Sequence, residues 1–294
     1  MKKIFTIALI IIFFLLKNNV VSSEETKYSI IYISGSGFGN FIKIQDGIDA
    51  ANPGDTVYVY NGTYFENVVI DKSIILIGEN KESTIIDGRS VGNTIKVNAN
   101  NVTIKNLTIQ HSGLIYPLSG INLSSNNNVI ENNLITYNFY GLTLYFSSEN
   151  IIRKNTIQND DHCGIYFSNS KNNLIINNTI RNNYYNGVGL YYSSDYNVIE
   201  GNNFSNNGFC GVNIRISSNN NVINNNFSNN NIGIHIPNYP NTANNNAFFN
   251  NNIDIEREFI SSETVPFLIF IFAVIVVLIA FIIYKKFRKK IRCN

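Results

Sequence analysis

A short segment repeats about six times between residues 120 and 252, and this repeat constrains the fold more than any other feature. Each copy begins with a glycine followed by apolar residues at alternate positions, and successive glycines lie 21 to 24 residues apart. These glycines are Gly120, Gly141, Gly164, Gly187, Gly211 and Gly233. Alternation with a period of two indicates strands, and a repeat of this length indicates a solenoid. Three short strands with three turns fit the repeat, which predicts one coil of a parallel β-helix per copy.

The alternation also predicts which side chains point inward. One column of inward side chains should contain Ile121, Leu142, Ile165, Val188, Val212 and Ile234, and the next Leu123, Leu144, Phe167, Leu190, Ile214 and Ile236. The residues between them should point to solvent, since neighbouring positions of a strand face opposite sides. These are Asn122, Thr143, Tyr166, Gly189, Asn213 and His235.

Asparagines recur at fixed places in each copy. One set lies two residues before a large apolar residue and consists of Asn133, Asn155, Asn178, Asn202 and Asn225. An asparagine amide both donates and accepts, so it can bond to its copies above and below and to turn backbone. We therefore interpret this set as a structural ladder and not as a ligand site.

These motifs resemble a known family. The columns Asn-Val-Ile-x-x-Asn-x-Ile and Gly-Ile-x-Leu, with the upstream segments 44–59 and 62–70, are similar to the NosD-type right-handed β-helix repeats. That family sits within the pectate-lyase-like group of carbohydrate-binding and sugar-hydrolysing β-helices and carries a copper-binding label. The resemblance covers residues 41–255 and implies an all-β, right-handed parallel β-helix, but one fold hosts many chemistries.

Both ends of the chain differ in composition from the repeat. A basic start with a short apolar run predicts a secretory signal, and an uncleaved anchor is the alternative. A helical spacing of apolar residues from Phe41 to Ala51 predicts a short helix that covers the open first coil. The uncharged run Val265–Tyr284 has the length of a spanning helix, and the basic residues after it should stay cytoplasmic. The expected organisation is a signal peptide (1–21), a strand and capping helix (24–54), a β-helix (55–255), a linker (256–264), a transmembrane helix (265–284) and a basic tail (285–294).

The charge distribution fits an exterior domain. The net charge is +2, but basic residues concentrate at the two ends, which leaves the part between them acidic. An acidic surface argues against nucleic acid as a partner, whereas the basic tail suits anionic lipid. We therefore predict a single-pass cell-membrane protein whose β-helix lies outside. Cys163 and Cys210 precede repeat glycines two coils apart, about 9.6 Å by strand spacing, so no disulfide is expected between them.

The first functional hypothesis is a non-enzymatic surface module that binds glycan or another cell-surface partner, or that is purely structural. Aromatic rings offer apolar faces with polar tips that suit sugars, although tyrosine is also a common strand residue. The predicted ligand-binding residues are Tyr145, Tyr166, Tyr191, Arg215 and His235, on the glycine-led strands next to an aromatic turn.

The second hypothesis is a carbohydrate-active enzyme, a polysaccharide hydrolase or lyase. Asp160, Asp161 and His162 form the one cluster with acid–base character, and they are the candidate catalytic residues. Glycoside hydrolysis usually needs two carboxyl groups about 5–9.5 Å apart. Asp160 occupies an asparagine column, which leaves Asp161 without an obvious partner, and the Asn-Thr-Asp and Gly-His-Gly motifs of polygalacturonase-like relatives are absent from the sequence.

The third hypothesis is metal handling, which follows from the copper label of the resembling family. Copper sites favour Cys, His and Met. The one methionine is Met1, and His111, His162 and His235 are scattered. No metal site and no cofactor are therefore predicted.

Overall fold

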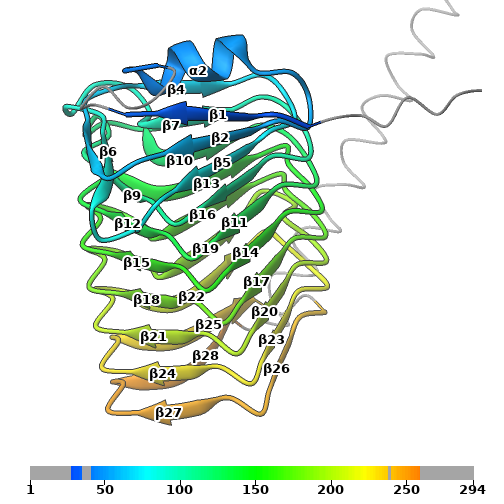
Figure 1. Ribbon diagram of the computed structural model, residues 1–294. Helices are drawn as coiled ribbons and strands as arrows, with labels where there is room; N and C mark the ends of the chain where they lie inside the picture. The colour runs from blue at the N-terminus through cyan, green and yellow to red at the C-terminus, as the bar shows by residue number, and fades with distance from the viewer. Residues whose placement is uncertain (1–27, 35–40, 238–239, 259–294) are drawn as a thin grey trace, which may run out of the picture.

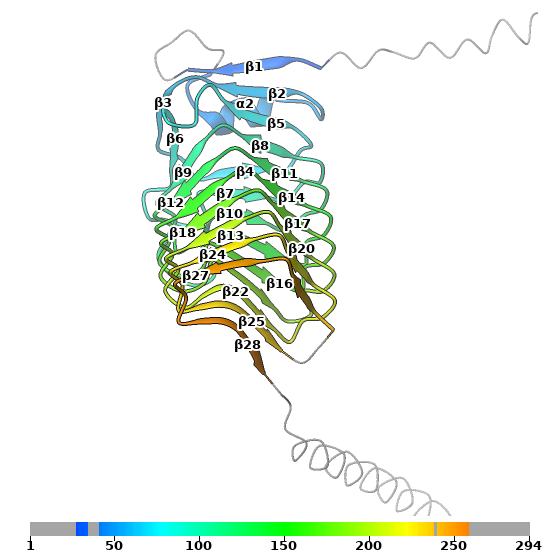
Figure 2. The same cartoon turned by 90° about the horizontal axis from the view of Figure 1, so that it is seen from below.

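The computed structural model describes residues 28–34, 41–237 and 240–258, and these residues form a rod of stacked coils (Figures 1 and 2). They contain three parallel sheets of ten, nine and nine strands that run along the rod, one strand from each sheet per coil. The predicted parallel β-helix is thereby confirmed. The predicted signal peptide, transmembrane helix and basic tail lie outside the described residues, and within the described residues no helix has the length and apolar character to span a membrane.

The first sheet begins the three-strand pattern of each regular coil. Its strands are β1 (Ile30–Ile33), β2 (Thr56–Val59), β5 (Ile75–Gly78), β8 (Thr103–Lys105), β11 (Val129–Glu131), β14 (Ile151–Arg153), β17 (Leu174–Ile176), β20 (Val198–Glu200), β23 (Asn221–Ile223) and β26 (Thr242–Asn244).

The second sheet follows it after one turn. Its strands are β3 (Gly62–Tyr64), β6 (Thr84–Asp87), β9 (Thr108–Gln110), β12 (Leu134–Thr136), β15 (Thr156–Gln158), β18 (Thr179–Arg181), β21 (Asn203–Ser205), β24 (Asn226–Ser228) and β27 (Ala247–Phe249).

The third sheet carries the repeat glycines at or just before its strands from β10 onward. Its strands are β4 (Val68–Ile70), β7 (Ile95–Val97), β10 (Ser119–Leu123), β13 (Tyr140–Tyr145), β16 (Ile165–Ser168), β19 (Val188–Tyr191), β22 (Cys210–Arg215), β25 (Ile232–Pro237) and β28 (Ile253–Glu258).

The helix α2 (Ile44–Ala50) lies at one end of the stack (Figure 1). It buries Ile44 and Ile48 and contacts β1, β2 and β4. That this helix protects the open coil against association with other chains stays a prediction.

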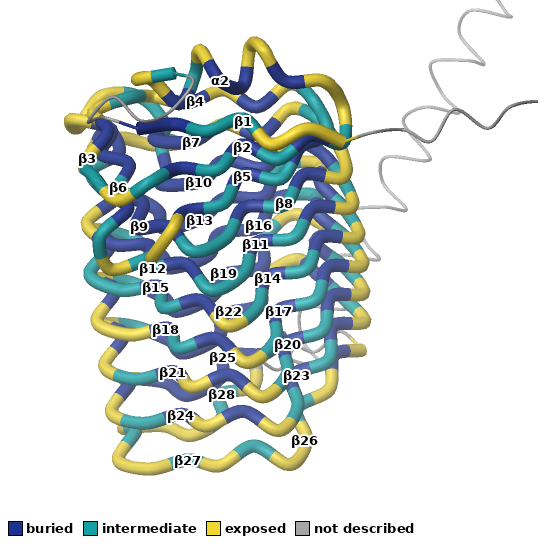
Figure 3. The backbone as a smooth tube through the Cα atoms, in the orientation of Figure 1, coloured by how far each residue is buried: buried dark blue, intermediate teal, exposed yellow. Residues whose placement is uncertain are grey.

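The inward columns form the core. Ile121, Leu142, Ile165, Val188 and Val212 are paired in register from strand to strand, as the alternation predicts. All are fully buried, and so is the neighbouring column from Leu123 to Ile236. In Figure 3 the buried segments recur in successive coils along the rod. Apolar burial of this extent is the main force that holds the coils together.

Three buried asparagine columns satisfy the turns between the sheets. In the predicted ladder, Asn178 donates from its backbone N–H and from Nδ2 to Oδ1 of Asn202, at 2.8 and 3.0 Å. Its Nδ2 also donates to the carbonyl of Ile152, and its Oδ1 accepts from the N–H and Nδ2 of Asn155. The ladder contains Asn133, Asn155, Asn178, Asn202, Asn225 and Asn246. Each asparagine thus provides for buried backbone groups that a turn would leave unpaired.

A second use of asparagine lies at the exposed turn positions. Asn172, Asn182 and Asn206 adopt positive φ values between 55° and 56°. Asparagine tolerates this left-handed conformation better than most residues. The asparagine content of the repeat therefore has two physical causes, the buried ladders and the left-handed turns.

Candidate functional site

The outer face of the third sheet is covered, which corrects the prediction that its side chains face solvent. Tyr166 is only 7% exposed and His235 only 4%. Asn122, Thr143 and Asn213 of the same column are buried too. These side chains lie outside the inner core, so their predicted direction is correct, but they are shielded from solvent.

A second hydrophobic cluster, here called the outer cluster, does the covering. Tyr140, Cys163 and Tyr166 are buried in it, and Phe139, Tyr145, Tyr185 and Tyr191 pack partly buried against them. The Tyr166 ring stacks on Tyr191 with centroids 5.1 Å apart, and it lies 5.9 Å from Tyr145. The predicted residues Tyr145, Tyr166 and Tyr191 are therefore brought together, but their rings pack against one another and do not extend separately into solvent.

Tyr191 shows how this layer is built into the sheet. Its hydroxyl accepts from Nδ2 of Asn186 at 3.0 Å and from Nδ2 of Asn213 at 3.4 Å. The ring folds back over Gly189, where an added Cβ would lie 2.5 Å from it. Burial raises the pKa of Tyr191, and also those of Tyr145 and Tyr166, so these hydroxyls stay protonated over the physiological range.

Arg215 and His235, the other two predicted ligand-binding residues, differ in exposure. Arg215 is exposed and pairs in register with Tyr191 at the far end of the strand. His235 is buried, with Nδ1 3.0 Å from Oδ1 of Asn213 and Nε2 3.7 Å from a Glu256 oxygen. Burial makes His235 part of the sheet rather than a contact for a ligand.

Asp160 is also unavailable to a ligand. It occupies the third asparagine column, where Oδ1 accepts from the N–H and Nδ2 of Asn138 at 2.9 and 3.2 Å. Its Oδ2 is buried without a hydrogen-bond partner among the described residues. Burial raises the pKa of Asp160 well above its usual range, and the neighbouring Asp161 adds to the shift. The carboxyl group of Asp160 is part of the third asparagine column, so this candidate catalytic residue does not reach the surface beside Asp161.

His162 belongs to a column of rings on the turn before the third sheet. The ring centroids of Phe139 and His162 lie 5.6 Å apart, those of His162 and Tyr185 4.9 Å, and those of Tyr185 and Phe209 5.1 Å with nearly parallel planes. Burial lowers the pKa of His162, which favours the neutral imidazole. The column gives the turn a continuous aromatic surface over four coils.

His162 also contacts the one cysteine of the outer cluster. Its Nδ1 lies 3.2 Å from Sγ of Cys163, and Nδ2 of Asn186 donates to the same sulfur at 3.6 Å. Burial raises the pKa of the Cys163 thiol to about 12, so it stays protonated and unreactive. Cys163 and Cys210 are both free, in agreement with their predicted separation.

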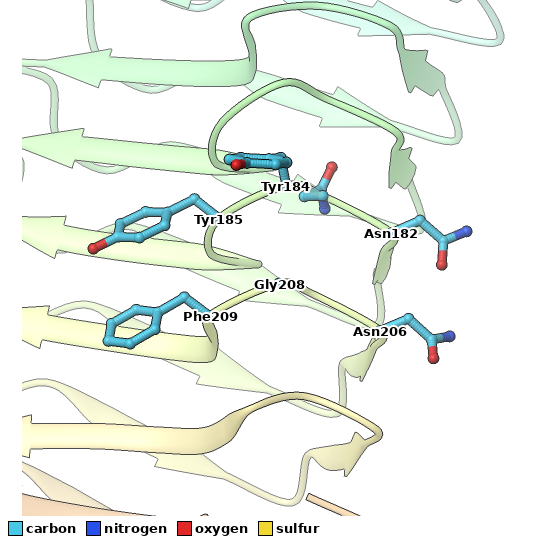
Figure 4. A pocket seen from close by; sticks show the side chains of 7 residues that line it. Asn182, Tyr184, Tyr185, Asn206, Gly208 and Phe209 are labelled. Atoms are coloured by element: carbon cyan, nitrogen blue, oxygen red, sulfur yellow. The ribbon is translucent and has the colours of Figure 1, made fainter. Parts of the chain in front are cut away.

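An open groove lies beside the aromatic column. It has a volume of about 710 Å³ and is lined by Asn182, Asn183, Tyr184, Tyr185, Asn206, Gly208 and Phe209 (Figure 4). Tyr184 is 80% exposed. Figure 4 shows the Tyr185 and Phe209 rings on one side of the turn and the amides of Asn182 and Asn206 on the other.

One of the turn positions that line the groove lacks a side chain. Asp161, Tyr184 and Gly208 make the same backbone bond to the coil before them, each N–H donating to the carbonyl of the preceding ladder residue. A Cβ on Gly208 would lie 2.1 Å from the carbonyl oxygen of Tyr184, so the two coils approach too closely here for a side chain at this position. From sequence, Tyr184, Tyr185 and Phe209 belong to the aromatic turn next to the predicted ligand-binding residues, but they were not among those residues. The sequence signal is the glycine at a turn position that is occupied by aspartate and tyrosine in the two preceding coils.

The fold has many relatives of known structure. A family model described as "Periplasmic copper-binding protein (NosD)" matches residues 48–261. No curated protein sequence matches the chain. Pectate lyase Pel9A matches with a TM-score of 0.56 and 15% identity, over 80% of each chain.

Two further solved structures show the same fold. An alginate lyase from Paenibacillus sp. str. FPU-7 has a TM-score of 0.56 and 14% identity, covering 78% of this chain and 98% of its own. The catalytic domain of a GH87 alpha-1,3-glucanase in complex with nigerose has a TM-score of 0.57 and 18% identity, covering 80% of this chain and 45% of its own. At such identities the likeness establishes the fold alone.

Proposed function

The chain belongs to the NosD family of right-handed parallel β-helix proteins, and from this premise we propose that it is a non-enzymatic surface module that binds glycan. The observation that carries the proposal is the exposed ring of Tyr184 above the bare backbone of Gly208, beside the stacked rings of Tyr185 and Phe209. An exposed aromatic face next to amide groups suits a sugar, whose C–H face packs on the ring while its hydroxyls bond to the amides. Structural relatives described as an alginate lyase and as an alpha-1,3-glucanase in complex with nigerose add support.

The experiment compares two exposed tyrosines in different turns. The full-length chain is immobilised and tested against an oligosaccharide array, together with Tyr184→Ser and Tyr196→Ser. Tyr196 is 56% exposed but lies in the turn before the first sheet, so its loss serves as a matched control. We expect Tyr184→Ser to lose at least tenfold in glycan affinity and Tyr196→Ser to bind like the parent. Equal binding by all three proteins would place the site elsewhere, and an array without any bound glycan would reject the proposal.

The geometry supports catalysis less well. Asp161 is exposed, but Asp160 is held in the ladder with both oxygens out of reach of solvent. Hydrolysis with two carboxyl groups needs both of them at the bond. A carbohydrate-active enzyme is therefore the alternative to test, by incubating the oligosaccharides with the chain and following new reducing ends or unsaturated products.

Copper binding, which the family description names, does not fit the donor groups of residues 28–34, 41–237 and 240–258. Among the residues that the structure describes, no three His, Cys, Asp or Glu side chains gather where they could hold a metal ion. His162 and Cys163 supply a pair, but Cys163 is fully buried in the outer cluster and no third donor of this kind lies beside the pair among the described residues. No part of the proposed function involves copper.

We further propose that the β-helix is held outside the cell by the apolar run Val265–Tyr284, with the basic end of the chain in the cytoplasm. Support comes from the length of the run and the six basic residues after it. A truncated chain ending at Ser262 should be recovered from the medium or a salt wash, whereas the full chain should stay with membranes. Retention of the truncated chain on membranes would instead indicate an anchor at the amino-terminal end.

A further inference from the structure

The chemistry of the groove indicates which glycans it accepts. Seven residues line it, and all are aromatic, amide or glycine, with no ionisable acid or base among them apart from tyrosine hydroxyls. Amides can bond to sugar hydroxyls as donors and as acceptors. They cannot neutralise a carboxylate, for which proteins commonly use the guanidinium of arginine.

The nearest charges along the same turn make an anionic ligand less favourable. Asp161 holds the turn position of Tyr184 in the adjacent coil and is exposed. Neighbouring coils of a β-helix are about 4.8 Å apart. The side chain of Asp161 therefore sits about one coil spacing from the base of the Tyr184 ring. At this distance its negative charge repels the carboxylate of an anionic ligand bound at the ring.

One cation lies close in sequence but is turned to another surface. Arg181 ends β18, directly before Asn182. Its Nε donates to Oε1 of Gln158 on β15 at 2.9 Å, over the outer face of the second sheet. Arg181 is not among the residues that line the groove.

The rings favour a ligand with an apolar face. Tyr184 presents most of its surface to solvent, and Tyr185 and Phe209 are stacked at one coil spacing with planes 9° apart. A neutral pyranose can pack its C–H face on such a ring without losing the hydration of a charged group, a loss that costs a carboxylate far more than a hydroxyl.

We infer, on the basis of the proposed function, that the groove selects neutral glycans and rejects polyuronates. This distinguishes the chain from structural relatives whose names refer to pectate and alginate. Selection has two sources: the uncharged lining, which offers a carboxylate no counter-ion, and the negative charge of Asp161 beside it.

The test uses oligosaccharides that differ in charge but not in length. The full-length chain is titrated with nigerotetraose, cellotetraose and mannotetraose, with tetragalacturonate, and with fully methyl-esterified tetragalacturonate. We expect at least one neutral tetramer to bind, and tetragalacturonate to bind at least tenfold more weakly than that tetramer. Asp161→Asn should reduce the ratio of these two affinities threefold or more at low salt. Asp46→Asn removes the same charge from α2 at the other end of the rod and should leave the ratio unchanged.

Each other outcome is decisive. Tetragalacturonate binding as tightly as the best neutral tetramer would overturn the inference and leave glycan binding intact. An unchanged ratio of the two affinities in Asp161→Asn would reject the part of the inference that rests on that charge. Binding of none of the five tetramers would overturn both the inference and the proposed function.

Discussion

The interior of the coil and the outer face of the third sheet are built from the same strands but follow different rules. Inside, each column repeats one kind of side chain, such as Ile121, Leu142 and Ile165. Outside, the column that contains Tyr166 also holds a threonine, a glycine, asparagines and a histidine. Stacking requires only that inner side chains fill the same space in every coil. Positions that break the repeat are therefore the ones at which the sequence specifies something beyond the fold.

The ladder and the exposed turn give the sharpest test of this contrast, because both use asparagine. Asn178→Gly removes an amide that bonds to two neighbouring coils, and it leaves the carbonyl of Ile152 and the amide of Asn155 without their partner. We expect a loss of about 3 kcal/mol or more in the free energy of unfolding, at about 1–3 kcal/mol for each stranded group. Chemical denaturation of the purified variants measures it.

The matched control is Asn172→Gly. Asn172 has a φ of 56°, a conformation that glycine adopts freely, and its side chain is exposed. We expect a change of at most about 0.5 kcal/mol. Similar losses for the two variants would contradict the assignment of Asn178 to a stabilising ladder.

Tyr166 and Tyr184 test the contrast within the outer surface. Tyr166→Ser empties a space among Tyr140, Tyr145 and Tyr191 and should cost about 2 kcal/mol, somewhat less than the loss of a ring from an inner core. Tyr184→Ser should change the free energy of unfolding by less than about 0.5 kcal/mol because its ring is exposed. Thermal unfolding of both variants decides the point. A Tyr166→Ser protein as stable as the parent would mean that the outer cluster contributes nothing to folding.

Asp160 breaks the repeat of the third asparagine column, whose other described members include Asn138, Asn183, Asn207 and Asn230. Its Oδ2 lies where the other members carry Nδ2, and it lacks a partner. Asp160→Asn returns the missing donor toward Oδ1 of Asn183 and should raise the free energy of unfolding by about 1 kcal/mol or more near neutral pH.

The pH dependence follows from the raised pKa of Asp160. The folded chain keeps this proton above pH of about 4, where the unfolded chain has lost it. The folded state then binds more protons, so stability falls as pH rises toward the folded-state pKa. The gain from Asp160→Asn should therefore be smaller at pH 4 than at pH 8. The reverse change, Asn207→Asp, should destabilise the protein more at pH 8, and a gain or loss independent of pH would contradict a buried, protonated Asp160.

Much of the fold could be predicted from the sequence because it is periodic. The inner columns and the spacing of Asn178 and its copies follow from one sequence pattern that occurs in several copies. An irregular copy can therefore be interpreted by comparison with the others. The burial of Tyr166 could not be predicted in this way. Alternation fixes which side of the strand a residue faces, but it does not reveal that Tyr191 folds back over Gly189 and closes the outer face.

Predicting the groove requires a comparison of equivalent turn positions in successive coils, which the alternation of apolar residues does not provide. Gly208 shares a turn position with Asp161 and Tyr184, and it is the one of the three that has no side chain, where the chain passes close to the carbonyl oxygen of Tyr184. Aligning the turns as carefully as the strands would have indicated it. The same alignment places Asp160 in the ladder and separates its role from that of Asp161.

Hydrogen–deuterium exchange of the full-length chain, with and without the tightest neutral tetramer, tests the central claim most directly. If the positions that break the repeat form the binding surface, protection should increase in residues 182–185 and 206–209. The turns at residues 170–173 and 194–197, which lie in the same coils ahead of the first-sheet strands, should exchange at an unchanged rate. Protection confined to those other turns, or spread evenly along the rod, would contradict the account.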